Sequence, residues 1–130
     1  MMRLLQPTRV MRNDSPAMRG LFWILALATS ATQVLCALGS GNPDTAQPFA
    51  DWINTTANLL NILIAVLVLL PATRFWGAVA AAIIMIVSAI TNFQVDGYAY
   101  FLKVLPFDVL AFALAAVVAW HHRGDVRGGA

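Results

Sequence analysis

The chain has 130 residues, which is a usual length for a single domain. Hydrophobic residues make up 60% of it and charged residues 11%, whereas soluble domains have roughly 45–50% and about 25%. A soluble fold of this length could not bury so much apolar surface, so the composition indicates an integral membrane protein. The formal net charge is +2, but seven of the eight basic residues are arginines near the ends of hydrophobic segments. This distribution argues against a nucleic-acid partner.

The chain begins with a polar, basic stretch followed by a hydrophobic one. Residues 1–19 contain two prolines, so we expect a disordered cytoplasmic tail, within which Met18 is an alternative start. The hydrophobic segment 21–38 is long enough to cross a bilayer as a helix. A basic stretch before an apolar run is also the pattern of a cleavable signal peptide. We favour a retained helix, because the run is longer than a usual signal core and residues 37–39 form a weak cleavage site.

Three further apolar segments have the length of a membrane span. Turn-rich stretches separate them, and the short link 71–74 predicts an antiparallel pair of helices. The apolar runs are uninterrupted, which favours helices over a barrel whose strands would alternate apolar and polar residues. We therefore predict an all-α, four-transmembrane-helix bundle over residues 20–123, followed by a cytoplasmic tail at 124–130. The predicted spans are 21–38, 52–70, 75–91 and 105–120.

The basic residues that flank the spans predict the orientation of the bundle. Arginines precede the first span, occupy the link 71–74 and follow the fourth span, whereas the opposite loops carry aspartates and Lys103. All seven arginines thus fall on one face of the membrane, which is expected to be cytoplasmic. The prediction is an up-down-up-down bundle with both termini in the cytoplasm, in a multi-pass protein of a bacterial inner membrane. The arginines are Arg3, Arg9, Arg12, Arg19, Arg74, Arg123 and Arg127.

Polar side chains recur at helical spacing within the spans, so they share the faces that should meet other helices. From the helix directions, they converge on the outer half of the bundle. One interpretation is that they form hydrogen bonds which hold the helices together, with Asp108 placed near the start of its helix. The other is a polar pocket for a small molecule, a quinone head group or a proton, in which a carboxyl group close to hydrocarbon could exchange protons. The candidate pocket residues are Gln33, Asn58, Asn61, Asn92 and Asp108.

No sequence motif indicates a catalytic centre. Cys36 is the only cysteine, which excludes an intramolecular disulfide and a multi-cysteine metal site. It also lacks a base within helical reach that would make it a nucleophile. His121 and His122 are adjacent and would point to different sides of a helix, so we interpret them as interfacial residues at a helix C-terminus rather than as metal ligands. We accordingly predict no catalytic residue and no metal site.

Residues 67–78, LVLLPATRFWGA, contain a leucine-rich helix end that turns through a short link with Thr-Arg and restarts with Gly or Ala. This arrangement resembles the DoxX-like family of small integral membrane proteins, and the resemblance covers roughly residues 52–123. Residues 105–107, LPF, and residues 120–123, WHHR, are similar as well. The resemblance implies a compact four-helix bundle in a group tied to quinone-linked sulfur oxidation and oxidative stress. Family members often carry an acidic residue in the second helix, where Asn58 and Asn61 stand here.

Two functional hypotheses follow. The first is a non-catalytic accessory protein or subunit of DoxX-like type, associated with a redox or quinone-linked membrane complex. The second is a bundle that binds or transports a small molecule or quinone through the outer polar pocket. Neither requires a resident cofactor, although quinone or lipid could occupy the pocket. The expected partners are the lipid bilayer and either a larger membrane complex or further copies of the chain.

Overall fold

The computed structural model describes residues 5–39 and 48–127, with the side chains of residues 5–37, 56–94 and 97–126. All regular structure in these ranges is helical, as predicted, and no strand occurs in them. The aspartates predicted in the first outer loop, Asp44 and Asp51, lie outside the described side chains. The elements are α2 (Arg9–Asn13), α3 (Pro16–Gly39), α4 (Pro48–Leu69), η2 (Pro71–Thr73), α5 (Arg74–Thr91), the π-helix η3 (Asn92–Asp96), α6 (Tyr98–His122) and α7 (Gly124–Arg127).

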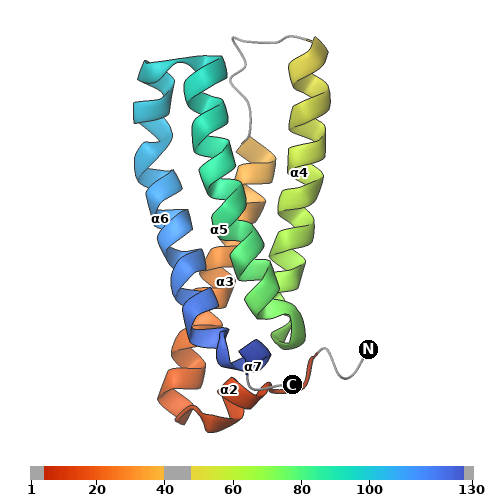
Figure 1. Ribbon diagram of the computed structural model, residues 1–130, viewed down its shortest axis with the longest axis vertical. Helices are drawn as coiled ribbons and strands as arrows, with labels where there is room; N and C mark the ends of the chain where they lie inside the picture. Colours follow the sequence, from red (N-terminus) through yellow and green to blue (C-terminus); the bar gives the residue numbers. More distant parts are fainter. Residues whose placement is uncertain (1–4, 40–47, 128–130) are drawn as a thin grey trace.

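The four long helices α3, α4, α5 and α6 lie side by side along the length of the molecule (Figure 1). The turn η2 joins α4 to α5 at the lower end of the view, and η3 joins α5 to α6 at the upper end. Helix α3 packs against α4 and α6, and α5 packs against α4 and α6. The short helices α2 and α7 contact each other at the lower end, so segments from the two ends of the chain meet there.

Three helical stretches are long and apolar enough to cross a membrane: Pro16–Ala37, Pro71–Gln94 and Tyr98–Val126. In α4 the apolar stretch among the residues searched is the shorter Thr56–Leu69. Large hydrophobic side chains such as Ile83, Ile86 and Ile90 point outward. Such an apolar surface is suited to contact with lipid rather than with water, as in a multi-pass integral membrane protein.

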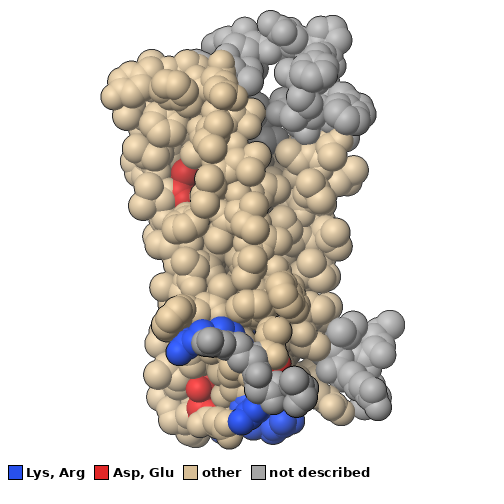
Figure 2. Space-filling model, viewed as in Figure 1, with Lys and Arg blue, Asp and Glu red and all other residues tan. Residues whose placement is uncertain are grey.

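Charged side chains gather at one end of the molecule. On the face shown in Figure 2, Lys and Arg cluster at the lower end, and one acidic patch lies apart from them in the upper half. The long middle of this face has neither charge, as expected for a surface that meets hydrocarbon.

Small side chains line the interior between the long helices. Ala26, Ala81 and Ala115, one from each of α3, α5 and α6, are fully buried and pack with Ile64 and Val68 of α4. Small residues allow close approach of helix backbones, which is the usual way in which helices pack in membranes. Their positions recur at helical spacing, so the packing faces follow from the sequence pattern.

The helices extend beyond the predicted spans, and the predicted tails are partly helical. The expectation of a disordered tail at 1–19 is wrong for the described part, because α2 forms at Arg9–Asn13 with Thr8 as its N-cap and α3 begins at Pro16. Proline is well suited to the first turn of a helix, where its missing N–H has no partner to lose. In the predicted tail 124–130, Gly124–Arg127 forms α7.

The last span also begins earlier than predicted, because α6 starts at Tyr98 and continues through Pro106. Gly97, with a φ of 88°, makes the turn from η3 into α6 and thereby allows this early start. Proline inside a helix removes one backbone hydrogen bond, which neighbouring helices in a membrane protein can accommodate. A proline in the sequence was therefore a poor marker of the helix start.

At Gly77 the backbones of α4 and α5 approach closely, and substitution of this glycine should weaken the packing of the two helices. A Cβ atom there would lie 2.7 Å from Val68 N and 2.8 Å from Leu67 C. Because backbone atoms cannot move aside as side chains do, Gly77→Ala is expected to destabilise the protein by about 1–3 kcal/mol. Thermal unfolding of the detergent-solubilised protein measures the change. Gly20→Ala is the control, since no atom lies within 4 Å of its Cβ position and alanine favours the helix. Equal stability of the two variants would contradict the close approach.

Candidate functional site

Three of the predicted pocket residues are buried and lack hydrogen-bond partners for part of their side chains. Gln33 of α3 is 0% exposed, and Asn61 of α4 and Asp108 of α6 are each 7% exposed. Among the described residues, neither Gln33 Nε2 nor Oε1 has a partner, and the same holds for Asn61 Oδ1 and Asp108 Oδ2. Most buried polar groups in proteins are hydrogen-bonded, so four such atoms in three side chains require an explanation.

Contacts between the helices place these three residues at one level. Ser30 Oγ of α3 donates to the carbonyl oxygen of Ala65 in α4 at 3.0 Å, and Phe22 of α3 stacks on His121 of α6 at 3.6 Å. From the lower end upward, residue numbers rise along α3 and fall along α4 and α6 (Figure 1). Three residues above Ser30, Gln33 is therefore level with the residue of α4 that lies three above Ala65, next to Asn61. Eleven residues above Phe22, it is level with a position on α6 two residues from Asp108.

The other two predicted residues do not share this position. Asn58 is half-buried one turn above Asn61 and has interactions of its own. Asn92 is half-buried at the start of η3, at the upper end of α5. The structure thus groups Gln33, Asn61 and Asp108 as the candidate site, and it places Asn58 and Asn92 above it.

The unpartnered atoms of the candidate site determine what it can bind. The oxygens of Gln33, Asn61 and Asp108 can accept hydrogen bonds, and Gln33 Nε2 can donate. Leaving a buried polar group without a partner costs about 1–3 kcal/mol. A polar ligand that supplies the missing bonds would recover this free energy, and a few polar groups in an apolar surrounding are typical of a binding site.

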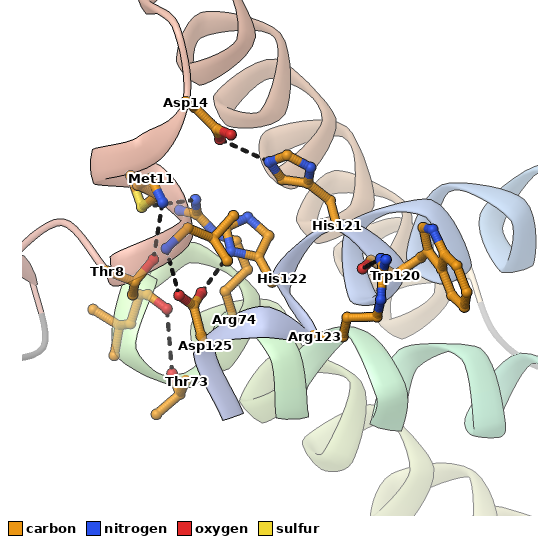
Figure 3. A network of polar contacts seen from close by, with 12 residues as sticks. Thr8, Met11, Asp14, Thr73, Arg74, Trp120, His121, His122, Arg123 and Asp125 are labelled. Carbon is orange, nitrogen blue, oxygen red and sulfur yellow. Dashed lines mark hydrogen bonds and ion pairs between the residues drawn. The ribbon is translucent and has the colours of Figure 1, made fainter. Parts of the chain in front are cut away.

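A second polar cluster closes the lower end of the molecule (Figure 3). His121 Nε2 lies 2.7 Å from Asp14 Oδ2, and His122 Nδ1 lies 3.0 Å from Asp125 Oδ2. The backbone N–H of Val10 donates to the other oxygen of Asp125 at 2.8 Å. These bonds tie α2 to α6 and α7. His122 is 0% exposed, and its Nε2 has no partner among the described residues.

Arg74 is the central residue of this lower cluster. Its guanidinium donates from Nε to Val68 O at 2.8 Å and from Nη2 to Leu69 O at 3.0 Å, and it lies 4.2 Å from the ring centre of Trp23. The side chain is only 1% exposed. The last carbonyls of α4 have no partner within the helix, and a cation is favoured at that end. Arg74 thus caps α4 from the first residue of α5 and fixes the turn between them.

Sequence reasoning missed most of the lower cluster. The sequence places Arg74 in the link 71–74 as one of seven arginines expected on the cytoplasmic face, and it places Asp14 and Asp125 in the predicted tails. The prediction that His121 and His122 lie at a helix C-terminus is confirmed, and the structure adds that the side chain of His122 is buried. Two aspartates and two histidines lie close to the ends of the helical region, and this match in number is the sequence signal that could have indicated their pairing.

Comparisons of the chain with family models, curated proteins and solved structures gave no match. Within the described residues, no group of three or more His, Cys or Asp side chains is arranged to hold a metal ion. The two polar clusters are therefore the features of the molecule that bear on its function.

Replacing Arg74 by lysine should destabilise the hairpin although the charge is retained. A lysine ammonium lacks the planar fork that reaches two carbonyls and stacks on an aromatic ring. We expect Arg74→Lys to lower the free energy of unfolding by about 2–3 kcal/mol, because hydrogen bonds from a charged group contribute about 1.5–3 kcal/mol each. Arg19→Lys, at an exposed position of α3, should change it by less than about 0.5 kcal/mol. If both variants unfold at the same temperature, Arg74 does not hold the turn.

Proposed function

We propose that this chain is an integral membrane protein whose four long helices form an up-down-up-down transmembrane bundle, and that the bundle binds a small polar molecule at Gln33, Asn61 and Asp108. The candidate site lies in the outer half of this bundle, and both termini are in the cytoplasm. The proposal assigns binding rather than bond-making chemistry to the chain.

The proposed orientation rests on where the positive charges are. Arginines cluster at the lower end (Figure 2), and cytoplasmic ends of membrane proteins are enriched in Lys and Arg. The buried cluster around Arg74 lies at the same end, and Trp76 and Trp120 are exposed near it. Tryptophan favours the level of the lipid head groups, which supports placing this end at a membrane interface.

Fusions to reporter proteins test the orientation. Green fluorescent protein after residue 130 should fluoresce, because this reporter matures in the cytoplasm, whereas alkaline phosphatase at the same place should be inactive. Alkaline phosphatase after residue 46, between α3 and α4, should be active because this point would lie outside. The opposite pattern of activities would overturn the orientation, and with it the assignment of the candidate site to the outer half.

One observation carries the binding function: three side chains from three helices present unpartnered polar atoms at one level of a buried interior. Hydrogen bonds that merely hold helices together would leave such atoms paired. Each unpartnered group lowers stability, so its presence is more simply explained by a ligand that pairs with it. A site between helices of a bundle is also a common position for small-molecule binding.

The resemblance of residues 67–78 to the DoxX-like family supports a related proposal, in which this binding bundle serves a larger redox or quinone-linked complex as an accessory subunit. The two proposals share the candidate site and differ in partners. Purification of the tagged chain from its membrane in mild detergent distinguishes them. Stoichiometric recovery of other subunits supports the accessory role, and recovery of the chain alone, with a small molecule bound, supports independent binding.

Gln33→Leu tests whether the candidate site is built for a ligand. In protein washed free of small molecules, leucine removes two unpartnered polar atoms from a fully buried position. We expect the variant to be more stable than the parent by about 1–2 kcal/mol, and to lose the small molecule that co-purifies with the parent. Thermal unfolding and native mass spectrometry measure the two effects.

Ser30→Ala is the matched control, three residues earlier on the same helix. Ser30 is also buried, but its hydroxyl is bonded to Ala65 O. The variant should lose about 1 kcal/mol of stability and retain the small molecule. If Gln33→Leu behaves like Ser30→Ala, then Gln33 holds helices together and the proposed function fails.

A further inference from the structure

The geometry points to a neutral ligand with at least two hydroxyl groups and an apolar remainder as the occupant of the site at Gln33, Asn61 and Asp108. This inference rests on the proposed function and specifies the chemical class of the ligand. It follows from which atoms of the site lack partners, from their number, and from the surroundings in which they lie.

The unpartnered atoms are unequal in kind. Three are oxygens, one each from Gln33, Asn61 and Asp108, and one is the amide nitrogen of Gln33. The two amide oxygens only accept hydrogen bonds, and the nitrogen only donates. Asp108 Oδ2 accepts when ionised and can donate when it carries a proton. In either state of Asp108, the ligand must supply at least two donors and one acceptor.

This requirement excludes three simple classes of ligand. A metal cation or an ammonium group has no acceptor and would face the N–H groups of Gln33, which it repels. A carbonyl compound such as a quinone only accepts, so the two amide oxygens would stay unpaired. A carboxylate would add a second negative group beside Asp108. A hydroxyl group donates one hydrogen bond and accepts others, so two hydroxyl groups meet the whole requirement when Asp108 carries its proton, and a third donor is needed when Asp108 is ionised.

The carboxamide is the remaining alternative, since it also donates and accepts. It holds these capacities in one plane on a single carbon, whereas the unpartnered atoms come from α3, α4 and α6. Two separate hydroxyl groups can reach different helices independently. Ala111 and Ile64, about one turn from Asp108 and Asn61 on the same helices, are buried apolar residues, which suits an apolar remainder. Water has the same hydrogen-bonding capacities, so an experiment must separate it from a ligand.

A comparison of two probes separates a bound ligand from water. We would measure how 4-hexylresorcinol and its dimethyl ether bind to the protein in detergent. The two probes have the same ring, tail and oxygens, but only the first has hydroxyl donors. We expect the resorcinol to bind at least about tenfold more tightly, because the ether leaves amide oxygens unpaired. Isothermal titration of the parent and of Gln33→Leu in the same micelles removes the contribution of partition into detergent.

Three probes of the excluded classes complete the design: hexyl-benzoquinone, hexylamine and hexanamide. Weaker binding of all three than of the resorcinol supports the inference. If any of them, or the dimethyl ether, binds as tightly and depends on Gln33, the ligand class is wrong while the proposed function stands. If no probe binds the parent more tightly than Gln33→Leu, both the ligand class and the proposed function are wrong, and water is the partner of the unpartnered atoms.

Discussion

A polar group inside an apolar surrounding must be paired by the chain or by a molecule bound to it, because neither lipid nor apolar side chains can hydrogen-bond to it. This constraint explains why so much of the structure depends on Arg74. The end of α4 leaves carbonyl groups unpaired in a place that water reaches poorly, and a buried guanidinium donates to two of them. By doing so from the first residue of α5, Arg74 sets the angle at which the second helix leaves the first. Gly77, one turn later, then allows the two backbones to approach closely.

The same need to pair buried polar groups explains why the N-terminal helix α2 is held in a fixed place. A helix of five residues such as α2 has little stability of its own. It is held in place by Asp125, which accepts from the N–H of Val10, and by Asp14, which pairs with His121. Met11 is buried against Arg74, with Sδ at 3.8 Å from Nη1. The lower end of the helix assembly is thus covered by its own chain, and only His122 Nε2 is left there without a partner among the described residues.

The long helices and the short N-terminal helix α2 show what the sequence could and could not predict. The long apolar segments predict the four long helices, since hydrophobic length and spacing are local properties. Helix α5 differs from the predicted 75–91 only at its first residue, whereas α6 begins at Tyr98, well before the predicted 105. Helix α2 could not be predicted, because its contacts come from residues more than a hundred positions away. Helical spacing also indicated Gln33, Asn61 and Asp108 as inward-facing, but it could not separate them from Asn58, whose position one turn higher changes its neighbours.

The polar residues of α3 include three side chains that are bonded within the protein and one, Gln33, that we propose binds a ligand. Thr29 donates to Leu25 O at 2.8 Å and Thr32 to Thr29 O at 2.7 Å, so both hydroxyls are satisfied by their own helix. Ser30 is satisfied by α4. These three short side chains behave as hydrogen-bonding groups in membrane helices usually do. Gln33 follows directly after them and is equally buried, yet among the described residues its longer side chain has no hydrogen-bond partner. A requirement for helix packing alone would be met by another threonine or serine at this position. An amide at this position is what the proposed ligand site requires.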